Sequence, residues 1–202
     1  MKQLIIATNN NHKIEEMKKF FASYDLEILS LKDVNIVSNP NEDGKTFKEN
    51  AFIKASSITH FTSLPILSDD SGLVIDALDG FPGVYSSRFM EDKSYKEKCQ
   101  KIIDMLKDKE DKKARFECVL CLMNVKEGPL YFMGKHEGKI VSQEGIGGFG
   151  YDPIFYSLEK EKTFANLSIE EKNEVSHRGR ALKKLIEYLE KNELIVKNRE
   201  IR

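Results

Sequence analysis

The sequence predicts an α/β protein with a mixed β-sheet and helices along its flanks. Apolar runs of strand length alternate with amphipathic helical patterns over residues 4–67, as in a β-α-β opening. Two further strand-like runs, 116–123 and 130–141, follow each other with no helix between them, so we expect mixed strands. No repeat and no low-complexity linker interrupts the chain, which favours a single domain over residues 1–202. We expect two lobes around a central substrate groove, where ligands usually bind.

In the N-terminal half, strands are expected at 4–7, at 26–31 and from Ile66, and residues 73–77 alternate enough to form another strand. Two helices lie between these strands, because apolar residues recur there at helical spacing. Those residues are Ile14, Met17, Phe20 and Phe21 in the first helix, and Phe47, Ala51, Ala55 and Ile58 in the second.

In the C-terminal half, two pairs predict helix starts: Ser94 with Glu97, and Ser168 with Glu171. Two glycines and a proline make residues 80–83 a loop. The helix after Ser94 is expected to bury Tyr95, Cys99, Ile102, Ile103 and Leu106, and a last helix buries Ala181, Leu182, Leu185, Ile186 and Leu189.

Composition excludes several classes of protein. The 32 basic and 33 acidic side chains leave a net charge of -1, which argues against binding nucleic acid or an anionic membrane. No apolar run is long enough for a spanning helix or a signal peptide, so we expect a cytoplasmic protein. Cys118 and Cys121 form a C-x-x-C, but they lie in a strand-like run with no second pair, which favours a buried strand over a zinc or redox site.

Thr8-Asn9-Asn10-Asn11-His12-Lys13 joins the first strand to the first helix. The free N–H groups of a helix start, together with the charge of Lys13, could hold a phosphate. The segment is not a P-loop, and an Asn-rich helix cap is the alternative interpretation.

Ser68-Asp69-Asp70-Ser71-Gly72 follows an apolar strand, and Glu42 lies in an earlier loop. Adjacent carboxylates at a strand end can bind Mg²⁺ and activate a water. Since neighbouring side chains of a strand point apart, the two carboxylates would have different roles. The alternative is an Asx-type turn with Gly72 at positive φ.

Residues 145–153 formally contain G-x-G-x-x-G, but Asp152-Pro153 follows where a Rossmann fold requires a helix. Phe149 and Tyr151 could instead stack on a base, or they could pack into the core. Near the last helix, Lys172, His177 and Arg178 form either a solvated basic surface or a patch for a base or phosphate.

Taken together, several ordered motifs resemble the inosine triphosphate pyrophosphatases, a family that hydrolyses noncanonical purine nucleoside triphosphates. The resemblance covers essentially the whole chain, and it implies an elongated α/β fold with a long mixed β-sheet and two lobes. The motifs are T-N-N-x-x-K near the start, T-F-x-E-N-A at 46–51, S-D-D-S-G-L near 70, F-P-G-V-Y-S-S-R at 81–88, R-F-x-C at 115–118, G-G-F-G-Y-D-P near 150 and S-H-R-G-x-A-L near 180.

The resemblance implies hydrolysis of ITP, dITP or XTP to the monophosphate and pyrophosphate by a homodimer that uses Mg²⁺ or Mn²⁺. It also implies the site. Asp70 would be the proton acceptor and, with Glu42, a metal ligand, and Asp69 would support the metal. Glu49 flanks the same loop and is the alternative to Glu42. The remaining residues would bind substrate: Thr8, Asn9, Asn10, Asn11, His12 and Lys13 the triphosphate, and Ser71, Phe149, Gly150, Tyr151, Asp152, Lys172, His177 and Arg178 the rest of the pocket.

Chemistry is consistent with these assignments, because Lys13, a divalent ion and Asp70 would supply charge for the leaving pyrophosphate and an activated water. A hydrogen-bond donor facing position 6 of the base would favour a 6-keto purine over adenine, and His177 and Arg178 are our candidates. Asn166 departs from the acidic residue that is frequent in the family. The alternatives are a septum-inhibitor-type pyrophosphatase, which would open with an S-x-S-P-R-R-like segment, and a non-catalytic nucleotide-binding module.

Overall fold

A mixed sheet forms the framework of the protein, in a computed structural model that describes residues 1–126 and 128–198. Within those residues the sheet has seven strands in the order β2-β1-β3-β4-β5-β6-β7, with β4 spanning Lys113–Met123. Strand β1 (Gln3–Ile6) pairs in parallel with β2 (Glu27–Ser30) and with β3 (Ile66–Ile75). Strand β6 (Phe155–Ser157) is antiparallel to β5 (Leu130–Ile140) and to β7 (Lys162–Thr163). The predicted mixed α/β class is therefore confirmed.

Five α-helices accompany the sheet in the described part of the chain: α1 (Asn11–Phe21), α2 (Phe47–Ser56), α3 (Tyr95–Met105), α4 (Ile169–Val175) and α5 (His177–Lys191). Both predicted capping boxes are present, Ser94 with Glu97 at α3 and Ser168 with Glu171 at α4. Helix α2 has a third capping box. One expectation for α3 is wrong, because Tyr95 is 39% exposed. It is the first residue of its helix, where its ring makes a T-shaped contact with Tyr151 and the Lys98 ammonium lies 4.7 Å from the ring centre.

Strand β3 runs without a break through the segment that we expected to interrupt it. The alternative interpretation, a turn with Gly72 at positive φ, is absent from the described chain, in which five other glycines have that conformation. Asp69 is fully buried and Asp70 is only 7% exposed. The strand can continue because each carboxylate meets a lysine from a helix, so burying the charge does not require the chain to turn outward.

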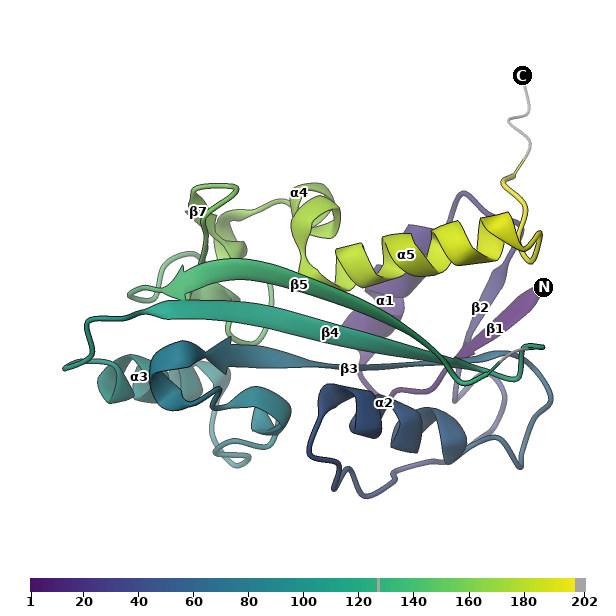
Figure 1. Ribbon diagram of the computed structural model, residues 1–202, viewed down its shortest axis with the longest axis horizontal. Coiled ribbons are helices and arrows are strands. Elements are labelled where there is room, and N and C mark those ends of the chain that lie inside the picture. Colours follow the sequence, from purple (N-terminus) through teal and green to yellow (C-terminus); the bar gives the residue numbers. More distant parts are fainter. Residues whose placement is uncertain (127, 199–202) are drawn as a thin grey trace. The chain divides into compact units, whose positions relative to one another are not determined.

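Contacts within the chain divide it into two compact units, which we describe separately. The first unit comprises the described residues of 1–70, 119–133 and 181–202, and the second comprises 71–118 and 134–180. In the first unit, Figure 1 shows α1 and α2 on opposite faces of β1 and β3. The second unit has its own core, which includes Leu73, Ile75, Cys99, Ile102, Phe116, Ile154, Phe155 and Phe164.

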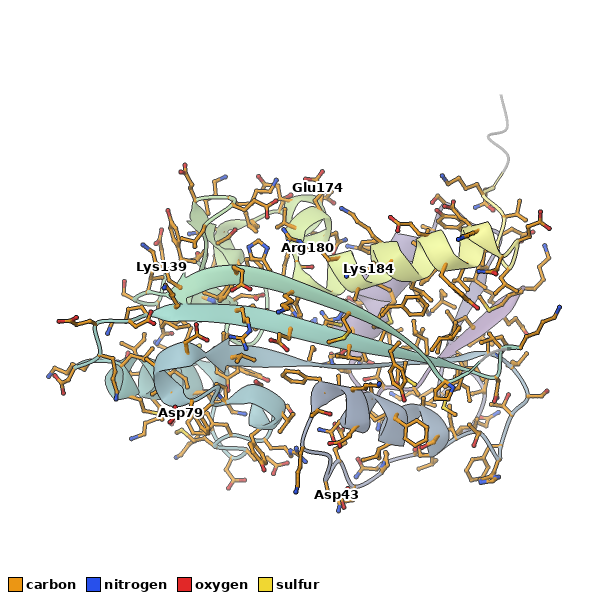
Figure 2. The ribbon with its side chains drawn as sticks, viewed as in Figure 1. Asp43, Asp79, Lys139, Glu174, Arg180 and Lys184 are labelled. Carbon is orange, nitrogen blue, oxygen red and sulfur yellow. The ribbon has the colours of Figure 1, made fainter. Side chains whose placement is uncertain are left out.

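Charged side chains of both signs occupy the surface, in keeping with the near-zero net charge. Figure 2 labels examples, and five of them are exposed: Asp43, Asp79, Lys139, Glu174 and Lys184. Among the helices of the described residues, none has the length and apolar character that crossing a bilayer requires.

Candidate active site

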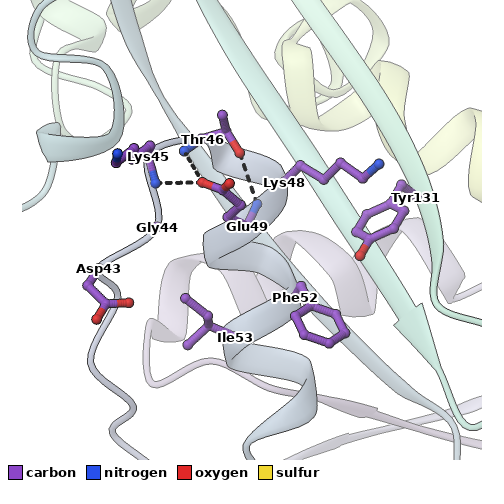
Figure 3. A pocket seen from close by; sticks show the side chains of 9 residues that line it. All are labelled: Asp43, Gly44, Lys45, Thr46, Lys48, Glu49, Phe52, Ile53 and Tyr131. Atoms are coloured by element: carbon purple, nitrogen blue, oxygen red, sulfur yellow. Dashed lines mark hydrogen bonds between the residues drawn. The ribbon is translucent and has the colours of Figure 1, made fainter.

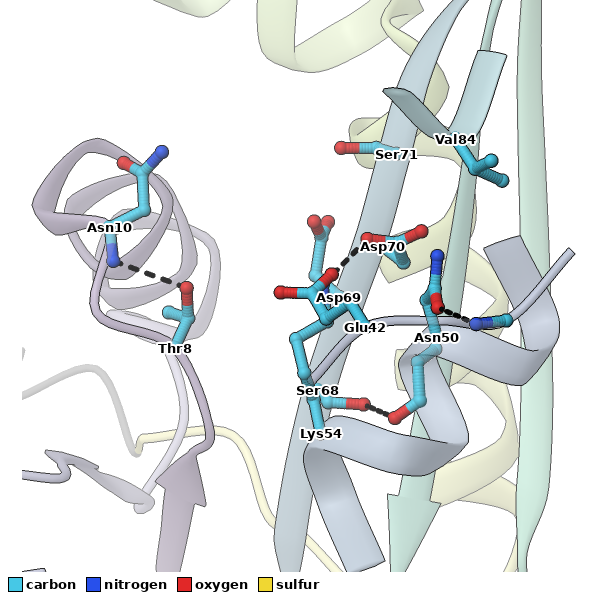
Figure 4. Close-up of polar contacts among 12 residues, drawn as sticks. Thr8, Asn10, Glu42, Asn50, Lys54, Ser68, Asp69, Asp70, Ser71 and Val84 are labelled. Atoms are coloured by element: carbon cyan, nitrogen blue, oxygen red, sulfur yellow. Dashed lines mark hydrogen bonds and ion pairs between the residues drawn. The ribbon is translucent and has the colours of Figure 1, made fainter. Parts of the chain in front are cut away.

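In the first unit, Asp69 and Asp70 point to different helices, as the alternation of side chains along a strand requires. Asp69 accepts a hydrogen bond from Lys13 Nζ at the start of α1. Asp70 Oδ1 lies 2.6 Å from Lys54 Nζ of α2. Figure 4 shows the two carboxylates on strand β3. The two side chains therefore point apart, as the sequence predicts, and each has a different lysine as its partner.

Lys54 also joins Glu42 to the same group, because its ammonium lies 3.1 Å from Glu42 Oε2. Burial by itself would lower the pKa of Lys54, but Asp70 and Glu42 outweigh it and the pKa is raised. We call Glu42, Lys54 and Asp70 the carboxylate–lysine cluster. Lys54 was not among the residues predicted for the site. The signal that could have indicated it is a lysine one helical turn after Asn50, beside the apolar stripe of α2.

Burial raises the pKa of Asp70 to about 6, although the Lys54 and Lys13 charges act in the opposite direction. The second carboxylate oxygen, Asp70 Oδ2, is buried and has no hydrogen-bond partner within residues 1–126 and 128–198. A carboxylate with a pKa near neutrality and an oxygen to spare can accept a proton from water.

The loop after β1 leads into the start of α1, where an anion could bind. Asn10 caps the helix, accepting a 3.3 Å hydrogen bond from the Lys13 N–H, and Thr8 Oγ1 accepts from the Asn10 N–H at 3.2 Å. The Asn9 amide donates to the Ser38 carbonyl at 3.0 Å. The side chains at this helix end are largely exposed, since Asn9, Asn10, Asn11 and His12 all face solvent. A phosphate could therefore approach it directly.

The carboxylates do not form a complete metal-binding site by themselves. Within the described residues, no three His, Cys, Asp or Glu side chains surround one point. Asp69 pairs with Lys13, whereas Glu42 and Asp70 share Lys54. Glu49 is tied up elsewhere, because its carboxylate accepts from the Lys45 and Thr46 N–H groups in the capping box of α2. Of the two glutamates considered as metal ligands, Glu42 is therefore the one that lies beside Lys54, the partner of Asp70.

A separate hollow of about 700 Å³ lies on the first unit, around the start of α2 (Figure 3). Its walls combine charged side chains with apolar ones, and the ammonium of Lys48 lies 4.5 Å from the centre of the Tyr131 ring. Neither Lys54 nor Asp70 is among the described residues that line it, which are Asp43, Gly44, Lys45, Thr46, Lys48, Glu49, Phe52, Ile53 and Tyr131.

In the second unit, Lys172 and Asp152 form a buried ion pair, with Nζ and Oδ2 separated by 2.6 Å. The same Asp152 oxygen accepts a 2.8 Å hydrogen bond from the Phe149 N–H, which fixes the glycine-rich loop. The Lys172 ammonium lies 4.7 Å from the centre of the Phe149 ring. Gly148 is required here at φ +70°, since a Cβ atom would lie 2.2 Å from Asp152 Oδ2.

His177 and Arg178 begin α5 and are both buried. The His177 ring stacks on Phe116 at 4.8 Å between centroids. Arg178 donates a 3.1 Å hydrogen bond to Ser71 Oγ, and its guanidinium lies 5.9 Å from the centre of the Phe149 ring. These residues, with Lys172 and Asp152, form a cation–aromatic cluster that is buried, so the alternative of a plain solvated basic surface is wrong.

The two aromatic residues of the glycine-rich loop differ in their surroundings. Tyr151 is 3% exposed, and its hydroxyl donates to the Ser86 carbonyl at 2.8 Å, so its side chain belongs to the core. Phe149 is partly exposed and contacts the cations described above. Gly150 has φ +70° and continues into a 3₁₀ turn at Asp152–Ile154, so no Rossmann helix follows.

Fold and site define an α/β protein in which two adjacent buried carboxylates on one strand are each paired with a lysine from a different helix. The sequence profile of the Ham1 family matches residues 4–188, and the chain belongs to this family.

Similar proteins agree with that assignment. The chain is 45% identical over 194 residues to the dITP/XTP pyrophosphatase of Bacillus anthracis, covering 93% of this chain and 96% of that protein. Among solved structures, a HAM1 protein from Coxiella burnetii superposes with a TM-score of 0.87 at 39% identity, over 95% of this chain and 100% of that one. The Staphylococcus aureus Ham1 protein gives a TM-score of 0.86 at 36% identity, with the same coverage.

Proposed function

We propose that this protein hydrolyses noncanonical purine nucleoside triphosphates, such as ITP, dITP and XTP, to the monophosphate and pyrophosphate. The observation that carries the proposal is Asp70, a buried carboxylate with a raised pKa and an oxygen unused by the described residues, held by Lys54. The name of the similar Bacillus anthracis protein, a dITP/XTP pyrophosphatase, supports the choice of substrate.

In this proposal the triphosphate binds at the start of α1. The free N–H groups of the helix end and the Lys13 ammonium carry the positive charge that phosphate oxygens need. Asp69 holds Lys13 in place from strand β3. As the bond to the leaving pyrophosphate breaks, negative charge grows on its oxygens, and Lys13 stabilises that charge.

Asp70 accepts the proton of the attacking water in this scheme. Its raised pKa suits the role, because a base is most effective when its pKa is close to the working pH. Lys54 then keeps the positive charge next to the carboxylate in both protonation states.

We further propose that Glu42 and Asp70 hold a divalent cation, Mg²⁺ or Mn²⁺. The donor set fits, since both are hard carboxylate oxygens, and Mg²⁺ is usually held by only one or two carboxylates together with substrate phosphates and water. When bound, the ion would withdraw charge from the phosphate oxygens.

We propose that the cation–aromatic cluster of the second unit binds the purine. Phe149 offers a ring face for stacking, and His177 and Arg178 offer donors for a 6-keto oxygen. Within the same unit, Arg178 donates a hydrogen bond to the hydroxyl of Ser71, the residue that follows Asp70 in the sequence.

The remaining expectations concern the whole molecule, and we keep them as proposals. We propose a single folding domain, a homodimer and a cytoplasmic location, the last because three cysteines cannot all pair within one chain and reduced thiols suit that compartment. A single cooperative thermal unfolding transition would test the single domain, and sedimentation would test the homodimer.

The proposed function is tested by incubating the protein with ITP, dITP, XTP, ATP and GTP in the presence of Mg²⁺ and measuring pyrophosphate. We expect pyrophosphate from the first three and much less from ATP. Absence of release from ITP, dITP and XTP over a full range of Mg²⁺ and Mn²⁺ concentrations would end the proposal.

A further inference from the structure

Two buried polar atoms of the first unit have complementary chemistry. Asn50 Nδ2, a hydrogen-bond donor, and Asp70 Oδ2, an acceptor, both lack a partner among the described residues. The Asn50 side chain is fully buried. Buried polar groups are nearly always satisfied by protein or by ordered water, so each of these two atoms calls for an explanation.

The orientation of the Asn50 amide follows from its other contact. The Gly44 N–H donates a 2.9 Å hydrogen bond to the Asn50 side chain. Because a backbone N–H can only donate, the atom facing it must be the oxygen Oδ1, and the NH₂ group must lie at the opposite end of the amide. The donor is therefore held in a fixed direction.

Two contacts align α2 with β3 in this region. Ser68 donates its hydroxyl to the Ala51 carbonyl, and Lys54 reaches Asp70. Ser68 and Asp70 share one face of the strand, since they are two residues apart, and that face is turned to α2. Asn50 and Lys54 are four residues apart and share one face of the helix. Figure 4 shows the Asn50 amide nitrogen pointing toward the Asp70 carboxylate.

We infer that Asn50 is a catalytic residue that orients the attacking water together with Asp70. The inference rests on the proposed function. One water placed between the two atoms accepts a hydrogen bond from Asn50 Nδ2 and donates one to Asp70 Oδ2, so that both buried groups are satisfied. The water keeps its second lone pair for phosphorus. As its oxygen forms the new P–O bond, its proton moves to Asp70 Oδ2, and the bridging oxygen leaves with the pyrophosphate.

Two substitutions distinguish the proposed catalytic role of Asn50 from a structural role, in which its side chain only accepts the hydrogen bond of the Gly44 N–H. Asn50→Leu removes the donor and the acceptor without adding charge, whereas Asn50→Asp keeps an oxygen for the Gly44 N–H and removes the donor. For both we expect kcat for ITP to fall about 100-fold, as for the loss of one transition-state donor, with KM nearly unchanged. Binding of an ITP analogue with a methylene group between the α- and β-phosphates should keep its affinity. Thr46→Ala, which removes the cap of the same helix, should leave kcat nearly unchanged.

The outcomes are distinct. If the unmodified protein releases no pyrophosphate from ITP, dITP or XTP, the proposed function fails and this inference fails with it. If the unmodified protein is active and Asn50→Leu keeps its kcat, only the inference fails. A purely structural role for the Gly44 contact predicts that Asn50→Asp stays active, while Asn50→Leu loses affinity for the analogue. That result would also overturn the inference.

Discussion

The ammonium of Lys54 lies between two acidic side chains, 2.6 Å from Asp70 Oδ1 and 3.1 Å from Glu42 Oε2. Replacing it as Lys54→Met leaves two carboxylates together with no cation between them. We expect the free energy of unfolding to fall by about 3 kcal/mol at pH 8, the usual cost of leaving a buried charge unpaired.

The pH dependence of that loss has a definite sign. Without Lys54, the pKa of Asp70 rises further in the folded state, so the folded protein holds a proton that the unfolded chain releases. Its stability then falls as the pH rises, and the loss measured by urea unfolding should be smaller at pH 5 than at pH 8. Lys2→Met, which breaks an exposed pair with Asp25, should show little effect at either pH. Equal losses at pH 5 and pH 8 would contradict the argument.

Asp70→Asn should lower kcat by roughly 10³-fold, because an amide cannot accept the proton of the water. The fold should persist, since the amide has the same shape and its oxygen can still accept from Lys54. Pyrophosphate release measures the first effect and cooperative thermal unfolding the second. Turnover close to that of the unmodified protein would remove Asp70 from the role of base.

His177→Ala combined with Arg178→Ala should reduce the discrimination between ITP and ATP. A donor facing position 6 favours a keto oxygen and opposes an adenine amino group, so its loss should affect the two substrates in opposite directions. The measurement is the ratio of kcat/KM for ITP and ATP. An unchanged ratio would assign base recognition to other residues.

Gly148→Ala and Gly83→Ala form a matched pair. Both glycines have positive φ, and a Cβ at Gly83 has nothing within 4 Å, whereas a Cβ at Gly148 lies 2.2 Å from Asp152 Oδ2. Each substitution carries the strain of the left-handed region, about 1 kcal/mol or slightly more. Only Gly148→Ala should disturb the pairing of Asp152 with Lys172 and raise KM. Equal KM values for the two variants would show that the Asp152 contact is not needed for binding.

His136 should make the fold sensitive to acid. The side chain is buried, its Nδ1 lies 2.9 Å from the Val175 carbonyl, and its Nε2 lies 2.8 Å from Ser157 Oγ. Burial lowers the pKa of His136 below its ordinary value of 6.5, so as the pH falls below that value the unfolded chain binds a proton that the folded state does not. Stability is therefore lost as the pH falls through this window. His136→Gln should flatten the loss in urea unfolding between pH 7 and pH 5, and His60→Gln, at an exposed position, should not.

Much of the fold was predictable from local patterns. Capping boxes at Ser94 and Ser168 and the apolar periodicity of the helices depend on residues near in sequence, and these predictions are confirmed. The break expected at Ser68–Gly72 was wrong, because two consecutive aspartates indicate a solvated turn unless their partners are known. Lys13 and Lys54, which let the strand continue, lie 56 and 16 residues away in the sequence.

The candidate site divides in the same way. Sequence motifs identified the other residues of the clusters, whereas the roles of Lys54 and Asn50 were missed. Both lie on α2, and only the packing of α2 against β3 brings them close to Asp70. Tyr151 shows the opposite case. A tyrosine in a glycine-rich loop is chemically suited to stacking on a base, and only its burial against Ser86 shows that it belongs to the core.

The unbroken strand β3 also limits how the gene can change. Successive side chains of a strand alternate between its faces, so deleting or inserting a single residue between Ile66 and Asp69 would turn Asp69 toward α2 and Asp70 toward α1. Both aspartates would remain in the sequence, but each would meet the other's lysine. Length variation in this segment should therefore be tolerated only in steps of two residues, whereas point substitutions at its apolar positions can preserve the arrangement.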